Sequence, residues 1–174
     1  ATTDVMPYAV DYTGITALGL PFYILSVGGN HVVRADRSPT YSMTCIMIGA
    51  IIGDIVGSRF EWNNYRKKDF ILFTEDCFAT DDSIMSLAIA GAVLQHQTEA
   101  VDLSKAAVFW MQKVGRPYPH CGFGGNFYHW IYSDDPKPYN SFGNGAAMRV
   151  SACGLSAKTL EAALQMSTAV TAVT

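Results

Sequence analysis

The amino-acid sequence predicts an all-α, multi-helical domain, and three observations support this fold class. Apolar residues recur at helical spacing in several runs. Stretches rich in glycine and proline separate these runs, as is typical of loops. Hydroxyl and acidic residues stand directly before one long apolar run, where they can cap a helix. Helices are therefore expected at residues 45–56, 82–97, 103–114, 125–132 and 159–170.

The composition is that of one globular domain with plentiful apolar surface. The chain has 174 residues, of which 49% are hydrophobic and only 16% are charged. Some apolar surface should therefore meet another segment or a second copy in a homo-oligomer. The formal net charge is −3, and the basic cluster at residues 66–68 is followed at once by Asp69. This charge pattern predicts no nucleic-acid binding surface.

The cysteines and the N-terminal region predict a cytoplasmic protein that does not span a membrane. Cys45, Cys77, Cys121 and Cys153 have neither a CxxC spacing nor companion histidines, so we expect free, reduced thiols. No basic region precedes a short apolar core, as a secretory signal would require. The apolar stretch at residues 14–29 is short and contains proline and paired glycines, so it is not interpreted as membrane-spanning.

Residues 1–44 differ from the rest and are interpreted as a leader or small module of unknown function. Gly, Pro, Thr and Tyr recur there, and residues 35–40 have the composition of a linker. The main helical domain is therefore expected to span residues 45–174. Within it, the connections at 57–80 and 133–157 are long and lack a steady period, so they should carry the functional site.

Thr80, Asp81, Asp82 and Ser83 begin a long apolar helix, and two interpretations of them remain open. Hydroxyls and acids cap helices, because they accept hydrogen bonds from free backbone N–H groups and complement the helix dipole. One acid satisfies that role, whereas two adjacent carboxylates repel each other unless a cation or water separates them. Mg²⁺ and Mn²⁺ take oxygen ligands, and Thr80, Asp81 and Asp82 offer three within one turn.

Asp54 is the single acid in the apolar segment 49–57, and Glu61 follows it by seven residues. An acid among isoleucines needs a partner. Asp54 could cap a helix or form a salt bridge with a local group such as Arg59, or it could belong to a functional site. Glu61 is open to two interpretations as well, since most glutamates lie in solvated loops.

Residues 122–126, Gly-Phe-Gly-Gly-Asn, precede an aromatic helix. Glycines at such a place let backbone N–H groups approach an anion at a helix N-terminus. A plain turn is the simpler interpretation of the motif by itself. His120 and His129 lie nearby in sequence and are assigned no role.

Residues 141–149, Ser-Phe-Gly-Asn-Gly-Ala-Ala-Met-Arg, form a more specific motif. Ser141 can donate to a phosphate or ribose oxygen, and Phe142 can stack on a base or sugar. An ordinary turn is the alternative. Arg149 would lie in a packed segment, where a buried cation is costly without a carboxylate to meet. Three carboxylates are candidates for that partner: Asp54, Asp81 and Asp82.

The order of these motifs resembles that of the ADP-ribosylglycohydrolase family, which includes dinitrogenase-reductase-activating glycohydrolase and ADP-ribosyl-acceptor hydrolases. The resemblance extends from about Met47 to Thr174 and covers the N-terminal part of the family only. It rests on four motifs in the right order, at residues 53–61, 78–83, 122–125 and 141–149.

The resemblance implies an all-helical fold with a binuclear Mg²⁺ or Mn²⁺ centre that cleaves the N- or O-glycosidic bond between ADP-ribose and an acceptor. The family's first group of metal ligands matches Thr80, Asp81 and Asp82. Glu61 matches a glutamate that lies at the metal site and takes part in catalysis, so Glu61 and Asp82 are expected to be catalytic. The residues expected to bind substrate are Asp54, Gly122, Phe123, Gly124, Gly125, Ser141, Phe142, Gly143, Asn144, Gly145, Met148 and Arg149.

The resemblance also assigns roles to the two loops, and the sequence departs from the family in several ways. The glycines at 122–125 match a loop that contacts the diphosphate, and residues 141–144 match one that holds diphosphate and ribose. Family members are usually longer, and their second ligand group, Asp-x-Asp-Thr, has no counterpart here. We therefore expect half of the metal site and a missing C-terminal segment. Ser83 replaces a usual threonine, and residues 1–44 match nothing in the family.

Three hypotheses remain open at this stage. The first is a hydrolase of ADP-ribosylated substrates that acts as a longer chain or with a partner that provides the missing ligands. The second is an ADP-ribose or nucleotide-binding module without turnover. The third is an inactive fragment that oligomerises through exposed helix faces. None of the motifs indicates whether the acceptor is arginine, serine or another group.

Overall fold

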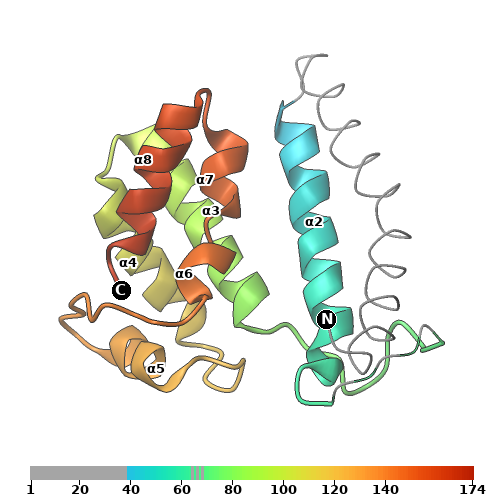
Figure 1. Ribbon diagram of the computed structural model, residues 1–174. Coiled ribbons are helices and arrows are strands. Elements are labelled where there is room, and N and C mark those ends of the chain that lie inside the picture. Colours follow the sequence, from blue (N-terminus) through green and yellow to red (C-terminus); the bar gives the residue numbers. More distant parts are fainter. Residues whose placement is uncertain (1–38, 64, 66, 68) are drawn as a thin grey trace, which may run out of the picture. The chain divides into compact units, whose positions relative to one another are not determined.

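The computed structural model describes residues 39–63, 65, 67 and 69–174, and this part of the chain is helical without a β-strand (Figure 1). The all-α prediction is confirmed for these residues. The expected leader lies almost entirely outside them, so its boundary stays a prediction. The elements are α2 (Pro39–Gly57), η1 (Ser58–Phe60), α3 (Asp81–Glu99), α4 (Leu103–Gly115), α5 (Gly125–Tyr132), α6 (Gly145–Met148), α7 (Ser151–Ser156) and α8 (Leu160–Thr171).

All five expected helices are present, and the main error lies at residues 133–157. That stretch was expected to be a loop, but it contains α6 and α7. These helices have four and six residues, which is too short for an apolar period to repeat. The helix expected from residue 45 starts at Pro39, because proline suits the first turn of a helix.

The core lies between α3 and α4, which pack along each other, while α7 and α8 cover them (Figure 1). Met85, Ile89 and Met111 are fully buried at this interface, together with small alanines that let the two helices approach closely. Gly91 of α3 faces the ring of Trp110 on α4, and the Trp110 Nε1–H group donates to Gln95 Oε1 at 2.9 Å. Close packing against α4 therefore holds α3 in place and supports its N-terminus.

Asp54 ties α2 to the start of α3. Its carboxylate accepts hydrogen bonds from the Thr80 backbone N–H at 2.8 Å and from the Thr80 hydroxyl at 2.5 Å. Thr80 is the N-cap of α3, so these bonds fix the first turn of that helix. Ile48 and Ile52 of α2 are exposed. No helix in the described part of the chain is long and apolar enough to cross a membrane.

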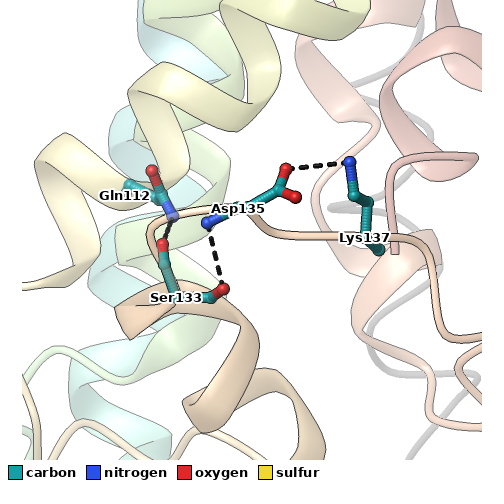
Figure 2. A network of polar contacts seen from close by, with 4 residues as sticks. All are labelled: Gln112, Ser133, Asp135 and Lys137. Carbon is teal, nitrogen blue, oxygen red and sulfur yellow. Dashed lines mark hydrogen bonds and ion pairs between the residues drawn. The ribbon is translucent and has the colours of Figure 1, made fainter.

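The chain that leaves α5 is held against α4 by a small polar network (Figure 2). Gln112 of α4 donates to the Ser133 carbonyl at 2.8 Å, and the Asp135 backbone N–H donates to the Ser133 hydroxyl at 3.2 Å. Asp135 also forms an exposed ion pair with Lys137 at 2.8 Å, which contributes little to stability in water. The network directs the chain from α5 toward residues 141–145.

The close α3–α4 packing predicts opposite effects for two glycine-to-alanine substitutions. A Cβ on Gly91 would lie 2.7 Å from the Trp110 ring, so Gly91→Ala should lower the free energy of unfolding by about 1–3 kcal/mol. Gly154→Ala in α7 meets nothing within 4 Å and should raise it by up to about 1 kcal/mol. Urea unfolding of both variants tests this, and equal changes would contradict it.

Candidate functional site

A pocket of about 460 Å³ brings together residues from segments far apart in the sequence. One wall carries carboxylates from the end of η1 and the start of α3. The opposite wall carries the glycine turn before α5 and the loop before α6. The lining consists of Glu61, Asp81, Asp82, Gly122, Gly124, Gly125, Asn126, Phe127, Tyr139, Asn140, Ser141, Phe142, Gly143, Asn144, Gly145, Ala146, Met148, Arg149 and Thr174.

The acidic wall depends on the cap of α3. Thr80 is 4% exposed, and its hydroxyl accepts from the Asp82 backbone N–H at 3.3 Å while donating to Asp54. Because one hydroxyl makes both bonds, the first turn of α3 has a fixed orientation. That orientation presents Asp81 and Asp82 to the pocket beside Glu61. The capping interpretation of Thr80 is thereby correct, and it leaves both aspartates free for another role.

The acids on this wall destabilise one another's charged forms. Burial, followed by repulsion from Asp82, Glu61 and Asp54, raises the pKa of Asp81 to about 6. Burial and the nearby charge of Asp54 also raise the pKa of Asp82. Within the described residues, no lysine or arginine forms an ion pair with these carboxylates. The wall therefore carries negative charge that no cation among the described residues neutralises.

The glycine turn packs directly against this wall. The Asp81 backbone N–H donates to the Cys121 carbonyl at 2.9 Å. Gly122 has φ +109°, and a Cβ there would lie 3.2 Å from Asp81 Oδ1, so only glycine fits without strain. Gly124 caps α5 without a side-chain bond, which leaves the first N–H groups of that helix free toward the pocket.

The loop at residues 141–145 is held by the end of α8. The Tyr139 and Ser141 backbone N–H groups both donate to the Thr174 carbonyl, at 3.0 and 3.3 Å. Asn140 adopts a left-handed conformation with φ 53°, which asparagine tolerates and which turns the chain into the loop. Phe142 lines the pocket and is fully exposed, so its ring is available to a ligand.

The prediction that Arg149 pairs with a carboxylate is wrong. Arg149 is 2% exposed, and its guanidinium donates to the Val170 carbonyl at 3.1 Å and to the Thr174 hydroxyl at 2.8 Å. Its position above the Phe127 ring, 5.8 Å from the centroid, adds a cation–π contact. Carbonyls in the last turn of a helix lack partners and carry partial negative charge, so α8 replaces a carboxylate. Burial lowers the pKa of Arg149 to about 10.

The proposed salt bridge between Asp54 and Arg59 is also absent among the described residues. Asp54 instead accepts from Thr80, and Arg59 donates to the Ile71 carbonyl and the Thr74 hydroxyl. The acceptors of the Arg59 guanidinium are therefore on the loop that follows η1.

Three residues expected at the site do not line the pocket. Asp54 and Thr80 lie behind the acidic wall and line a neighbouring cavity of about 410 Å³, together with Glu61 and Asp82. Phe123 packs on Phe127 with ring centroids 5.4 Å apart. All the other expected residues line the pocket.

Several residues that line the pocket have no individual role in the sequence analysis, although two of them, Asn126 and Ala146, lie within the motifs at 122–126 and 141–149. Asn140 carried a recognisable signal, since it directly precedes the Ser141 motif and asparagine favours left-handed turns. Thr174 belongs to the Val-Thr pair that the family resemblance matches at the end of the last helix, but that pair gives it no role in the pocket, because only the packing of α8 brings it to the loop. The lining residues without an earlier role are Asn126, Phe127, Tyr139, Asn140, Ala146 and Thr174.

The acidic wall has the donor chemistry of a metal site but not its convergence. Carboxylate and hydroxyl oxygens suit a hard divalent cation, which would also neutralise the repulsion around Asp81. In the described part of the chain, however, no three His, Cys, Asp or Glu side chains are close enough together to hold a metal ion. The residues therefore fit a divalent cation in type, without forming a preassembled ligand set.

The two walls together suit a ligand with two unlike ends. N–H groups of the glycine turn can receive an anionic group such as a phosphate. The carboxylates can accept hydrogen bonds from sugar hydroxyls or stabilise positive charge. The pocket therefore favours a phosphorylated sugar over a purely apolar ligand.

Comparison with known families gives one result. Residues 43–174, which are most of the chain, match the family model described as ADP-ribosylglycohydrolase. Searches of curated proteins and of solved structures found no significant match.

The raised pKa of Asp81 predicts a pH-dependent gain in stability on Asp81→Asn without divalent cations. Above about pH 6 the folded chain holds a partly desolvated charge that the unfolded chain hydrates, so the substitution should raise the free energy of unfolding. Between about pH 6 and 4 the folded carboxyl is protonated first, and the gain should shrink toward zero.

Urea unfolding of both proteins at about pH 7 and about pH 4 tests this expectation. The exposed Asp135→Asn provides a matched control, since its side chain is 78% exposed. An equal gain for Asp81→Asn at the two pH values would contradict the assigned cause.

Proposed function

The chain belongs to the ADP-ribosylglycohydrolase family, and from this premise we propose that it hydrolyses the glycosidic bond between ADP-ribose and an acceptor. The observation that supports the proposal is the pocket in which Asp81, Asp82 and Glu61 face the turn at 122–125 and the loop at 141–145. A diphosphate would lie against the N–H groups, and the ribose would lie against the carboxylates.

The family is generally metal-dependent, and we propose Mg²⁺ or Mn²⁺ as the cofactor. Thr80, Asp81, Asp82 and Glu61 would hold it, as half of the binuclear site that the family resemblance implies. Thr80 retains one acceptor lone pair beyond its bonds to Asp54 and Asp82, so it can still serve as a ligand. When bound, the cation would orient the ribose hydroxyls and lower the pKa of a bound water.

The carboxylates of the chain have their own roles in the proposed reaction. Departure of the acceptor develops positive charge on the ribose C1″ carbon and ring oxygen, which the acidic wall would stabilise. Glu61 would accept the proton of the attacking water and pass it to the departing acceptor, and Asp82 would orient that water or the ribose by accepting hydrogen bonds. Both groups line the same pocket.

The opposite wall would supply binding energy distant from the reacting bond. Phosphate contacts at residues 122–125 and 141–145 would hold the sugar in one orientation against the acids. Phe142, Met148 and Arg149 complete this wall: the exposed ring can stack on the ligand, and Arg149 holds the loop through Thr174.

A second candidate function is ADP-ribose binding without turnover. The absence of a convergent group of three metal-ligating side chains in the described residues favours it. The acceptor is not assigned, and the expected cytoplasmic location, homo-oligomer and absence of nucleic-acid binding stay predictions.

The two functions predict different effects of Mg²⁺ on ADP-ribose binding. For a hydrolase site, isothermal titration should show affinity that rises when Mg²⁺ is present. Asp82→Asn should remove most of that rise, about tenfold or more in affinity, while circular dichroism remains helical. Metal-independent binding would favour the binding module. Unchanged metal affinity in both Asp81→Asn and Asp82→Asn would count against the metal assignment.

The catalytic role of Glu61 predicts separate effects on turnover and binding. Glu61→Gln keeps the size of the side chain and removes its basicity, so turnover of an ADP-ribosylated peptide should fall by about 10²-fold or more. Affinity for ADP-ribose should change by less than about threefold. Steady-state kinetics and titration measure the two quantities, and equal losses in both would contradict a catalytic role.

A further inference from the structure

We propose that Arg59 is a positioning residue for Glu61, and this inference rests on the proposed hydrolase function. Glu61 lies at the start of the long connection between η1 and α3, and it lines the pocket from there. No group in the described part of the chain donates a hydrogen bond to its carboxylate. The place of that carboxylate therefore depends on the backbone that carries it.

Ser58 holds the two ends of this connection together. The Ser58 hydroxyl accepts from the Phe78 backbone N–H at 3.1 Å and donates to the Ile55 carbonyl at 2.9 Å. Ser58 is 5% exposed, so water does not compete freely for these bonds. The connection between η1 and α3 therefore has its two ends close together.

Arg59 of η1 forms hydrogen bonds with the far part of this connecting loop. Its guanidinium donates to the Ile71 carbonyl and, at 2.5 Å, to the Thr74 hydroxyl, which in turn bonds Asp76. These acceptors lie 12 and 15 residues away in sequence, so one side chain fixes the far part of the loop against η1. Removing Arg59 would leave the Ile71 carbonyl and Thr74 with fewer partners.

Aromatic rings support the same arrangement. The guanidinium lies 4.5 Å from the Phe60 ring centroid and 5.8 Å from that of Phe70. Phe60 and Tyr65 stack at 5.3 Å, and Phe60 meets Phe70 edge-on at 5.2 Å. The planar cation therefore packs on rings while its N–H groups bond, which an ammonium group reproduces only in part.

The consequence for Glu61 follows from its neighbours. Its backbone N–H donates to the Ser58 carbonyl at 3.4 Å, so the turn that includes Arg59 sets where the chain leaves η1. Phe60, directly before Glu61, is held by Arg59 and Phe70. Loss of the Arg59 bonds frees this turn, and a carboxylate displaced by about 1 Å loses catalytic effect rather than substrate affinity.

The test compares Arg59→Met with Arg59→Lys, using the whole chain and an ADP-ribosylated peptide. Arg59→Met should lower kcat about tenfold while KM changes by less than about twofold. Arg59→Lys should recover part of kcat, because it keeps the charge and one bond. Thr74→Val should lower kcat in the same direction and add little to Arg59→Met, since both act through one contact.

Arg116→Met is the matched control. Arg116 also donates to distant carbonyls, those of Ile131 and Ser133, but it lies outside the loop. It should reduce stability without lowering kcat. The proposal is overturned if Arg59→Met keeps normal kcat, if KM and kcat change equally, or if Arg116→Met gives the same loss of kcat.

Hydrogen–deuterium exchange separates this inference from the proposed function. Arg59→Met should speed exchange of amides at residues 60–63 about tenfold, and Arg116→Met should not. Unchanged exchange would overturn the role of Arg59 whether or not the chain hydrolyses the peptide. If Arg59→Met exchanges faster but the wild type shows no turnover of the peptide, the role of Arg59 is retained and the hydrolase is rejected. Thr74→Val and Arg59→Lys serve the same comparison if Arg59→Met does not fold.

Discussion

The two hydrogen bonds that Asp54 accepts from Thr80 determine the arrangement of the acidic wall. Thr80 uses the same hydroxyl to cap α3, so a contact between separate segments is coupled directly to the orientation of a helix N-terminus. Asp81 and Asp82 directly follow this cap, and both line the pocket. The half-buried Asp54 carboxylate is also satisfied by these two bonds, which explains an acid among the isoleucines of α2.

Charge is distributed unevenly around the pocket, and each side handles it by a different physical means. Within the described residues the carboxylates of Asp81 and Asp82 form no ion pair, and both have raised pKa values. Arg149 is buried without a carboxylate, and the carbonyl end of α8 stabilises it instead. The free acids can therefore act on a ligand, whereas the arginine is committed to holding the loop before α6. This difference separates acids that are available to a ligand from an arginine that supports the loop.

Local sequence was sufficient where one segment carries the whole signal. The long apolar runs predicted α3, α4 and α8, and the hydroxyl at Thr80 predicted the N-cap that the structure shows. It failed where elements are short, as in α6 and α7, since four to six residues contain no repeated period. It failed also for Arg149, because a carbonyl from a distant helix leaves no trace in the residues around an arginine.

The sequence by itself determined the fold class, the family and most of the residues that line the pocket, because helix periodicity, glycine turns and clustered acids are encoded locally. Tertiary structure decided which of these residues face one another. It placed Asp54 and Thr80 behind the acids, and Thr174 against the loop at 141–145. The physical reason is that partners separated by 26 to 35 residues meet only after the helices pack.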